Sequence, residues 1–525
     1  MWCHIFSPFA LVIRLDAEGD AKGTEAVKNF LHEATIAGLQ ARMASGASTS
    51  LEIAEAYVER IQTIDGLLHS VLEINPDFRE IAQPLDDERR GQGPRGPLHG
   101  IPILLKDNID TDDRMQTTAG SLALIGSHPA QDATVAARLR AAGAVILGKA
   151  NLSEWANFRS TQSISGWSAR GGQCQNPYRI GYNPCGSSSG SAVAVATNLA
   201  AAALGTETDG SIVCPSSTCG IVGIKPTVGL VSRAGVIPIA HSQDTVGPMT
   251  RTVADGAALL GVLAGPAPRD RATNASAEYA LRDYTRFLDP NGLAGARIGV
   301  ARQRYFGYHT ETDAVVEQAI ALMRRAGATI VDPANIPTAR DERMRESELT
   351  VLLYELKADM ASYLATRIAG RADLPQARTL ADLIAFNQAY PDLELELFGQ
   401  ELFQMAWQKG DLDDPAYLDA LALGKRLAGP EGIDAVMDAH QLDALIAPTG
   451  GPAWANDPQQ GDRYVGGSSR PAAVAGYPLI TVPAGFVDNL PVGITFMGRA
   501  WSEPVLIRLA YAYEQKSLAR RPPKL

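Results

Sequence analysis

Residues 184–227 read PCGSSSGSAVAVATNLAAAALGTETDGSIVCPSSTCGIVGIKPT, and this stretch decides the fold class. A glycine/serine run, Pro184 to Ser191, leads directly into an alanine- and valine-rich helical pattern. Small residues let two backbones approach closely, and the amides at a helix start can hold an anion or a polarised oxygen. Further on, Gly205 to Ile212 places a serine after a tight glycine turn between two apolar segments. Polar loops between buried elements indicate an α/β protein.

Two other interpretations of the glycine/serine run are weaker. A phosphate-binding loop ends in Gly-Lys-Ser or Gly-Lys-Thr, but residues 184–191 contain no lysine that would reach the phosphates. A flexible linker does not fit either, because helix and strand patterns flank the run tightly. Ser211 taken alone would suit a turn or a helix cap, so its interpretation as a nucleophile depends on the residues that accompany it.

Alternating helix and strand patterns extend outward from this stretch. An amphipathic helix is predicted over 24–45, and the capping pattern Thr49 to Glu52 predicts the start of a second helix. Residues 103–105 read as a short buried strand that ends at Lys106, and Asp132 is predicted to cap a helix that ends at Gly143. Further strands are predicted at 144–147, 297–300, 328–331, 444–447, 479–482 and 492–496, with helices over 315–325 and from Ser502. The predicted fold is an α/β/α sandwich with a mixed central β-sheet covered by helices.

One segment has the composition of a linker. Residues 264–279 begin with Ala-Gly-Pro-Ala-Pro and continue with polar residues. We predict a poorly defined segment over 1–20 and a single domain over 21–525. The parts of that domain are a helical start (24–80), a core (about 81–263), the linker (264–279) and a C-terminal part that completes the same sheet (280–525).

Composition and charge disfavour several function classes. A formal net charge of −11 argues against a nucleic-acid-binding surface, which needs clustered lysine and arginine. Five cysteines without paired spacing predict neither a disulfide framework nor a structural zinc, and favour a reducing compartment. The apolar run over 5–13 is not preceded by a basic residue, and no other apolar stretch reaches the roughly 20 residues of a membrane span. We expect a cytoplasmic protein that contacts neither nucleic acid nor membrane, or a periplasmic or secreted one if the N-terminus is wrongly assigned.

Several motifs together resemble the amidase signature family. They are the glycine/serine run, the sequence Thr-Asp-Gly-Ser over 208–211, the segment 220–227 and the pattern G-I-P-x-x-x-K-D over 100–107. The resemblance extends from about Leu51 to Glu514. It implies a Ser-cisSer-Lys triad in which Ser211 is the nucleophile, Ser187 follows a cis peptide bond and Lys106 is the base. The chain departs from the family at three positions, with Val213 where many members have arginine and with Cys185 and Ser189 where glycine is usual.

The residue types suit this chemistry. Serine is a weak nucleophile until a base takes its proton, and lysine acts as a base only where desolvation or neighbouring positive charge makes its neutral form accessible. Lys106, at the end of a buried strand, is placed for desolvation, whereas without the serines it would be expected to pair with Asp107 at the surface. The predicted oxyanion hole consists of the backbone N–H groups of Thr208, Asp209, Gly210 and Ser211.

Three blocks, over 153–158, 165–172 and 211–215, resemble bacterial peptide amidases within the family. This implies a serine amidohydrolase that converts a carboxamide, the C-terminal amide of a peptide, to carboxylate and ammonia through an acyl-Ser211 intermediate. Alternatives are an amidotransferase component that works on misacylated tRNA, a general aliphatic or aryl amide amidase, and a non-catalytic amide-binding protein. No metal is expected, because the eight histidines lack metal-site spacing. A cofactor and an obligate protein partner are not expected either. Trp155 and Trp167 are expected either in a substrate cleft or in the core.

Overall fold

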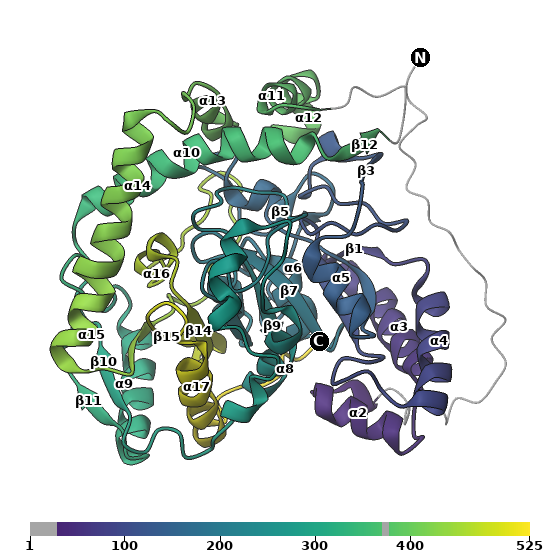
Figure 1. The fold of residues 1–525 in the computed structure, drawn as a ribbon, viewed down its shortest axis with the longest axis horizontal. Helices are drawn as coiled ribbons and strands as arrows, with labels where there is room; N and C mark the ends of the chain where they lie inside the picture. The colour runs from purple at the N-terminus through teal and green to yellow at the C-terminus, as the bar shows by residue number, and fades with distance from the viewer. Residues whose placement is uncertain (1–28, 370–376) are drawn as a thin grey trace.

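The computed structural model describes residues 29–369 and 377–525. The predicted N-terminal segment, the apolar run over 5–13 and the first residues of the helix predicted over 24–45 lie outside these ranges. Within them, Asn29–Leu31 is a 3₁₀ turn and Thr35 caps an α-helix over Ile36–Ala44, so one continuous helix over 24–45 is wrong. Figure 1 shows a central β-sheet with helices packed around it. Within the described ranges, no helix combines the length and the apolar character needed to cross a membrane.

Within the described residues, eleven strands form one mixed sheet. β2 pairs in parallel with β4 and β7, and β10 pairs in parallel with β11 and β13, while the other neighbouring strands are antiparallel. In spatial order the strands are β1 (Val71–Ile74), β4 (Val145–Ala150), β2 (Pro102–Lys106), β7 (Ala202–Glu207), β9 (Thr245–Thr250), β8 (Val222–Lys225), β14 (Leu479–Val487), β15 (Leu490–Met497), β13 (Ala444–Pro448), β10 (Arg297–Val300) and β11 (Thr329–Val331). The mixed central sheet and its predicted strands are confirmed.

Helices cover both faces of the sheet and its ends (Figure 1). α9 and α17 pack on β14, and α10 packs against α14 along one edge of the molecule. The helices are α2 (Ile36–Ala44), α3 (Ser50–Leu68), α4 (Phe78–Gln92), α5 (Thr134–Ala141), α6 (Ser189–Ala196), α7 (Val213–Thr218), α8 (Val253–Leu263), α9 (Thr310–Arg325), α10 (Glu342–Leu364), α11 (Leu380–Ala389), α12 (Pro391–Glu394), α13 (Glu401–Trp407), α14 (Pro415–Ala428), α15 (Asp434–His440), α16 (Arg470–Ala475) and α17 (Glu503–Ser517). The arrangement is the predicted α/β/α sandwich.

Local sequence signals explain several of these boundaries. Thr49 accepts a hydrogen bond from the N–H of Glu52, whose carboxylate in turn accepts from the N–H of Thr49, so the predicted capping box is confirmed. Asp132 does not cap α5, and this prediction is wrong. Its carboxylate instead accepts hydrogen bonds from the N–H of Asp112, in the preceding loop, and from the side chain of Arg140, near the end of α5, so other donors have taken the group that would have capped the helix.

The segment predicted as a linker is packed against the rest of the chain. Residues 271–278 form a 3₁₀ helix, and Arg138 donates hydrogen bonds to the carbonyls of Gly265 and Pro266. Strands from both sides of the segment join the same sheet, as expected for the C-terminal part. The division into a single domain over 21–525 remains a prediction.

The centre of the sheet determines where the polar segments meet. β2 and β7 are parallel neighbours, with Leu105 beside Leu204. Because the carboxyl ends of parallel strands lie at the same edge of a sheet, Lys106 at the end of β2 lies beside the residues that follow Glu207 at the end of β7. The stretch 208–211 therefore continues from the strand next to Lys106.

Candidate active site

Lys106 is a buried lysine held by hydroxyl and carbonyl oxygens. Its Nζ lies 2.7 Å from Ser187 Oγ, 2.9 Å from Thr206 Oγ1 and 3.2 Å from the Thr206 carbonyl oxygen. Among the described residues, Lys106 forms no salt bridge, and the carboxylate of Asp107 pairs with Arg170 at 3.2 Å. The surface pairing of Lys106 with Asp107, expected in the absence of the serines, therefore does not form.

The environment of Lys106 favours its neutral form. The side chain is 0% exposed, and burial lowers its pKa to about 7, although the carboxylates of Asp244 and Glu207 act in the opposite direction. A lysine with this pKa is partly neutral near pH 7 and is then able to accept a proton.

Ser187 lies in the loop that leads into α6. The peptide bond between Gly186 and Ser187 is cis, which confirms the conformation implied by the resemblance. The Ser187 side chain is buried. Gly186 has no room for a side chain, because an added Cβ would lie 2.1 Å from Ser153 Oγ. The loop therefore presents Ser187 to Lys106 through close backbone packing.

Ser211 lies between β7 and α7, next to the loop of Ser187. The N–H of Ser188 donates to the carbonyl of Ser211 at 3.1 Å, which holds the two serine-bearing segments together. No hydrogen bond joins the hydroxyls of Ser187 and Ser211 in the described structure. Catalytic hydrogen bonds are often long without substrate and shorten in the complex, so the arrangement places the two serines on adjacent segments without a completed relay.

Four backbone N–H groups beside Ser211 have no acceptor among the described residues. They belong to Thr208, Asp209, Gly210 and Ser211, the predicted oxyanion hole. Gly210 has a φ of +84°, a conformation that favours glycine, and it turns the chain between the strand and Ser211. Several free amides along one tight turn are suited to a developing negative charge on a carbonyl oxygen.

Glu207, which sequence analysis did not identify, stabilises the turn of Ser211 through hydrogen bonds from two backbone N–H groups. One of its carboxylate oxygens accepts from the N–H of Ile212 at 2.6 Å and from the N–H of Val213 at 2.9 Å. The side chain is buried, and burial raises the pKa of this carboxyl. The carboxylate therefore fixes the backbone on the C-terminal side of the serine.

Removal of the Glu207 carboxylate is expected to lower both turnover and stability. Glu207→Ala leaves two buried N–H groups without an acceptor, which costs about 1–3 kcal/mol each, and frees the turn of Ser211. We expect kcat for amide hydrolysis to fall about 100-fold. Urea unfolding of the same variant measures the loss of stability. Glu503→Ala is the matched control, because Glu503 is also buried but accepts from the N–H of Thr227, which is not part of the turn of Ser211. Equal kcat losses in the two variants would contradict a role specific to the turn.

Asp244, also missed by sequence analysis, ties a second loop to the same turn. Its carboxylate accepts from the hydroxyl of Thr208 at 2.6 Å and from the N–H groups of Ile239 and Ala240. Burial raises the pKa of Asp244 to about 6. The segment 239–244 is therefore attached to the turn through Thr208, in addition to the contacts of Glu207.

Cys185 and Cys214 form a disulfide, with 6.0 Å between their Cα atoms. The expectation of no disulfide is wrong for this pair, and the cysteine argument for a reducing compartment is lost, because disulfides persist in oxidising environments. The bond connects the residue before Gly186 to the third residue after Ser211. Trp454 and Tyr464 pack against it. The two serine-bearing segments are thus also joined covalently.

Loss of this disulfide is expected to reduce stability. A cross-link that closes a loop with a sequence separation of 29 residues contributes about 3 kcal/mol. The double variant Cys185→Ala/Cys214→Ala, or the wild type with a dithiol reductant, is expected to lose this amount in urea unfolding. Replacing the buried free cysteines Cys174 and Cys219 provides the control, which should still respond to the reductant. A wild-type protein unaffected by reduction would contradict the prediction.

A cavity of about 320 Å³ opens beside the turn of Ser211. Its lining brings together the disulfide and Gly186, Asp209 and Gly210 next to the nucleophile, and the loop 454–470, whose Trp454 and Tyr464 pack against the disulfide. The lining residues are Asn157, Ser165, Cys185, Gly186, Asp209, Gly210, Cys214, Trp454, Asp462, Tyr464, Gly466, Gly467, Ser469 and Arg470. A small amide-bearing molecule fits in this volume next to the free amides.

The two tryptophans have packing roles. Trp155 and Trp167 are both buried, and their rings contact Phe403 and Phe398 respectively. Of the two alternatives left open by the sequence, the core role applies to both.

Comparison with known proteins gives a consistent result. The family model described as Amidase matches residues 52–507. A probable amidase of Arabidopsis thaliana is 40% identical over 502 residues, which cover 94% of this chain and 92% of the relative. A glutamyl-tRNA(Gln) amidotransferase subunit of Chloroflexus aurantiacus is 36% identical over 498 residues, with 92% and 97% covered. Among solved structures, the native peptide amidase from Stenotrophomonas maltophilia is 55% identical, with a TM-score of 0.89 and coverage of 94% of this chain and 98% of that chain.

Proposed function

The chain belongs to the amidase signature family and is an amidase, and on this premise we propose that it hydrolyses the C-terminal amide of peptides to a carboxylate and ammonia. The observation that carries the proposal is the contact of 2.7 Å between the buried Lys106 amine and Ser187 Oγ, on the segment adjacent to Ser211. A desolvated lysine next to two serines is an acid–base group for a serine nucleophile.

In the proposed mechanism, Ser211 Oγ attacks the amide carbon while its proton passes through Ser187 to the neutral Lys106 amine. The N–H groups of residues 208–211 stabilise the oxyanion of the tetrahedral intermediate. Collapse of this intermediate breaks the carbon–nitrogen bond, and the proton returns through Ser187 to the leaving nitrogen, which departs as ammonia. A water molecule then attacks the acyl-Ser211 ester and gives one proton to the same relay. As the ester C–O bond breaks, the relay returns this proton to Ser211 Oγ, which frees the carboxylic acid product and restores the enzyme. Each relay group therefore acts as a base and then as an acid in both acylation and deacylation.

The assignment of peptide amides as substrates is supported by the peptide amidase of Stenotrophomonas maltophilia, whose sequence is 55% identical to this chain. The amidotransferase subunit from Chloroflexus aurantiacus is less similar, at 36% identity. A formal net charge of −11 also disfavours tRNA as a direct partner. No obligate protein partner is part of the proposal.

The proposed substrate class is tested by ammonia release from four kinds of amide. The panel contains peptide amides, free amino-acid amides, a long-chain fatty-acid amide and glutamine, all at equal concentration. We expect the highest kcat/KM with peptide amides. Equal or better turnover of the fatty-acid amide would indicate a general aliphatic amidase, and turnover confined to glutamine would favour an amidotransferase-like function.

A further inference from the structure

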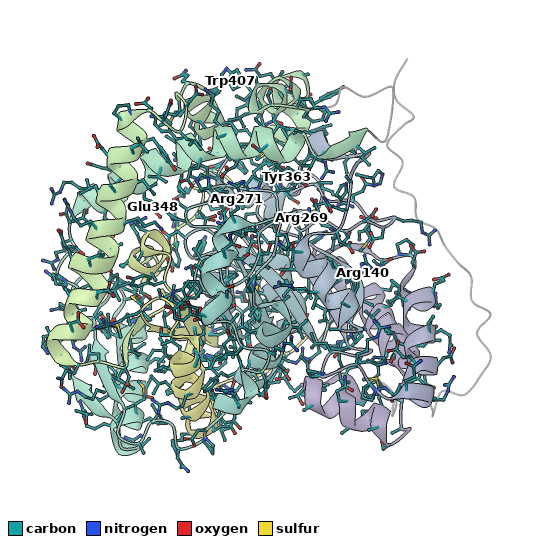
Figure 2. All side chains as sticks on the ribbon, viewed as in Figure 1. Arg140, Arg269, Arg271, Glu348, Tyr363 and Trp407 are labelled. Atoms are coloured by element: carbon teal, nitrogen blue, oxygen red, sulfur yellow. A yellow bond between two sulfur atoms is a disulfide. The ribbon has the colours of Figure 1, made fainter. Side chains whose placement is uncertain are left out.

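The cavity beside Ser211 contains an arginine whose charge is already matched. Arg470 Nε lies 2.7 Å from the buried carboxylate of Glu348 and 3.7 Å from that of Asp209. Glu348, labelled in Figure 2, comes from α10 and faces the start of α16, where Arg470 is located. The positive charge on this wall of the cavity therefore has two negative partners.

Asp462, which lines the same cavity, is a carboxylate without a cation. Its oxygens accept hydrogen bonds from the N–H of Ser165 at 3.0 and 3.2 Å and from Asn183 Nδ2 at 3.3 Å. Among the described residues, no lysine, arginine or histidine lies within 4.0 Å of it, and the neighbouring Arg463 is turned toward Asp457. Burial raises the pKa of Asp462, against the hydrogen bonds from Ser165 and the Trp454 indole.

A chain of short contacts connects Asp462 to the catalytic loop. An added Cβ at Gly186 would lie 3.3 Å from Asn157 Nδ2. This same amide nitrogen donates to Ser165 Oγ at 2.9 Å, and the Ser165 N–H donates to Asp462. Asp462 and Gly186 are thus connected through Asn157 and Ser165, and all four residues line the cavity.

A half-buried carboxylate that lacks a cation needs hydrogen-bond donors. An ionised carboxylate has about four acceptor positions, and the three protein donors leave at least one of them free. A charge removed from water costs free energy unless its hydrogen-bonding positions are filled. Carboxylates with an unfilled position are therefore typical of binding sites, where a ligand supplies the missing donor. A donor group on the ligand, either an N–H or an ammonium, would complete them here.

Resting on the proposed function, we propose that Asp462 binds the nitrogen on the α-carbon next to the scissile carbonyl. In a peptide amide this nitrogen is the N–H of the last residue, and in a free amino-acid amide it is the α-ammonium. It is the first donor that such a substrate presents beyond the carbonyl held at residues 208–211. Fatty-acid and aryl amides have no donor at this position. Asp462 is therefore a substrate-binding residue that selects α-amino acyl amides.

Four amides with one side chain test this assignment. They are N-acetylphenylalanine amide, its N-methyl analogue, phenylalanine amide with a free ammonium, and 3-phenylpropionamide, which lacks the nitrogen. We expect the wild type to favour N-acetylphenylalanine amide over the N-methyl analogue and 3-phenylpropionamide by about 10- to 100-fold in kcat/KM, the range for a hydrogen bond to a charged group. Any amide that is not turned over is measured as a competitive inhibitor, so that each compound gives a value.

The variant Asp462→Asn removes the charge with little change in shape. We expect kcat/KM for N-acetylphenylalanine amide to fall about 10-fold, mostly through KM, while 3-phenylpropionamide changes less than about 2-fold. Asp462→Ala is expected to show a larger loss in the same direction. Asp457→Asn is the matched control, because Asp457 lies on the same loop and its carboxylate accepts from backbone N–H groups outside the cavity.

The outcomes distinguish this inference from the proposed function. Equal losses on all four amides would overturn the role of Asp462 and leave peptide-amide hydrolysis intact. Failure of the wild type to hydrolyse any peptide amide would overturn the proposed function itself. A greater loss with phenylalanine amide than with the N-acetyl compound would identify the ammonium as the preferred donor, and the reverse would identify the peptide N–H.

Discussion

Ser211→Ala is expected to abolish ammonia release from peptide amides, with a loss in kcat of about 10⁴-fold or more. The variant lacks the oxygen that forms the acyl ester, while the free N–H groups of residues 208–211 and the cavity remain. Substrate binding should therefore be retained, and KI for an unreactive amide analogue should change little. The measurement is steady-state ammonia release, with the mass of the trapped acyl-enzyme as a second observable.

Other serines near this turn are poor alternatives for the nucleophile. Ser217 Oγ accepts a hydrogen bond from the N–H of Gly493 at 2.8 Å and is buried, and Ser216 is buried without a partner. Cys214 is held in the disulfide and has no free thiol. Substantial turnover by Ser211→Ala, or acylation of Ser217 by an inhibitor that leaves Ser211 unmodified, would show that the nucleophile has been assigned wrongly.

Features with short-range signals could be predicted from the sequence. The strand before Lys106 is an uninterrupted apolar run, and the capping box at Thr49 needs only residues three apart, so both follow from local patterns. The triad candidates followed from the resemblance to the amidase signature family, and the fold brings Lys106 into contact with Ser187 across 81 positions of sequence.

Features that depend on tertiary neighbours could not be predicted. The ion pair of Arg470 and Glu348 joins residues 122 positions apart, and Asp462 contacts Ser165 across 297 positions. No periodicity or motif signals such pairs. The disulfide was missed for the same reason, because a pair of cysteines 29 residues apart carries no pairing signal until the fold brings their Cα atoms to 6.0 Å.

Glu207 shows that even a residue inside the decisive stretch can be overlooked. In the sequence it reads as part of a polar turn, next to the threonine and aspartate of the motif. Its role appears only when the chain reverses after Gly210, which places the N–H groups of Ile212 and Val213 over its carboxylate. The direction of a side chain at a strand end is set by the following turn rather than by residue type.

Lys106→Met is expected to lower kcat by about 10³-fold or more, because methionine fills a similar volume without a basic nitrogen. In the wild type, kcat/KM should fall below about pH 7 as Lys106 becomes protonated, since burial lowers its pKa to about 7. The apparent pKa belongs to the coupled site, which includes the nearby Asp244 carboxyl with its pKa raised to about 6. The residual kcat/KM of the variant should not show this fall below about pH 7.

The combined variant Lys106→Met/Ser187→Ala should lose far less activity than the product of the separate losses, because the two residues act as one unit.

The single substitution Lys106→Met should reveal the cost of burying this lysine through the pH dependence of stability. In the unfolded chain, lysine takes up its proton near pH 10.4, whereas in the folded protein Lys106 does so only near pH 7. Between these values the unfolded state binds more protons, so the wild-type free energy of unfolding should fall with decreasing pH, by up to about 1.4 kcal/mol per pH unit from this group. The methionine variant lacks this contribution. Its free energy of unfolding minus that of the wild type should therefore increase as the pH is lowered from 10 to 7 and stay constant below pH 7. Urea unfolding of both proteins at pH 6, 7, 8 and 9 measures this difference, and a value independent of pH would show that Lys106 is protonated in the folded protein throughout and is not the base.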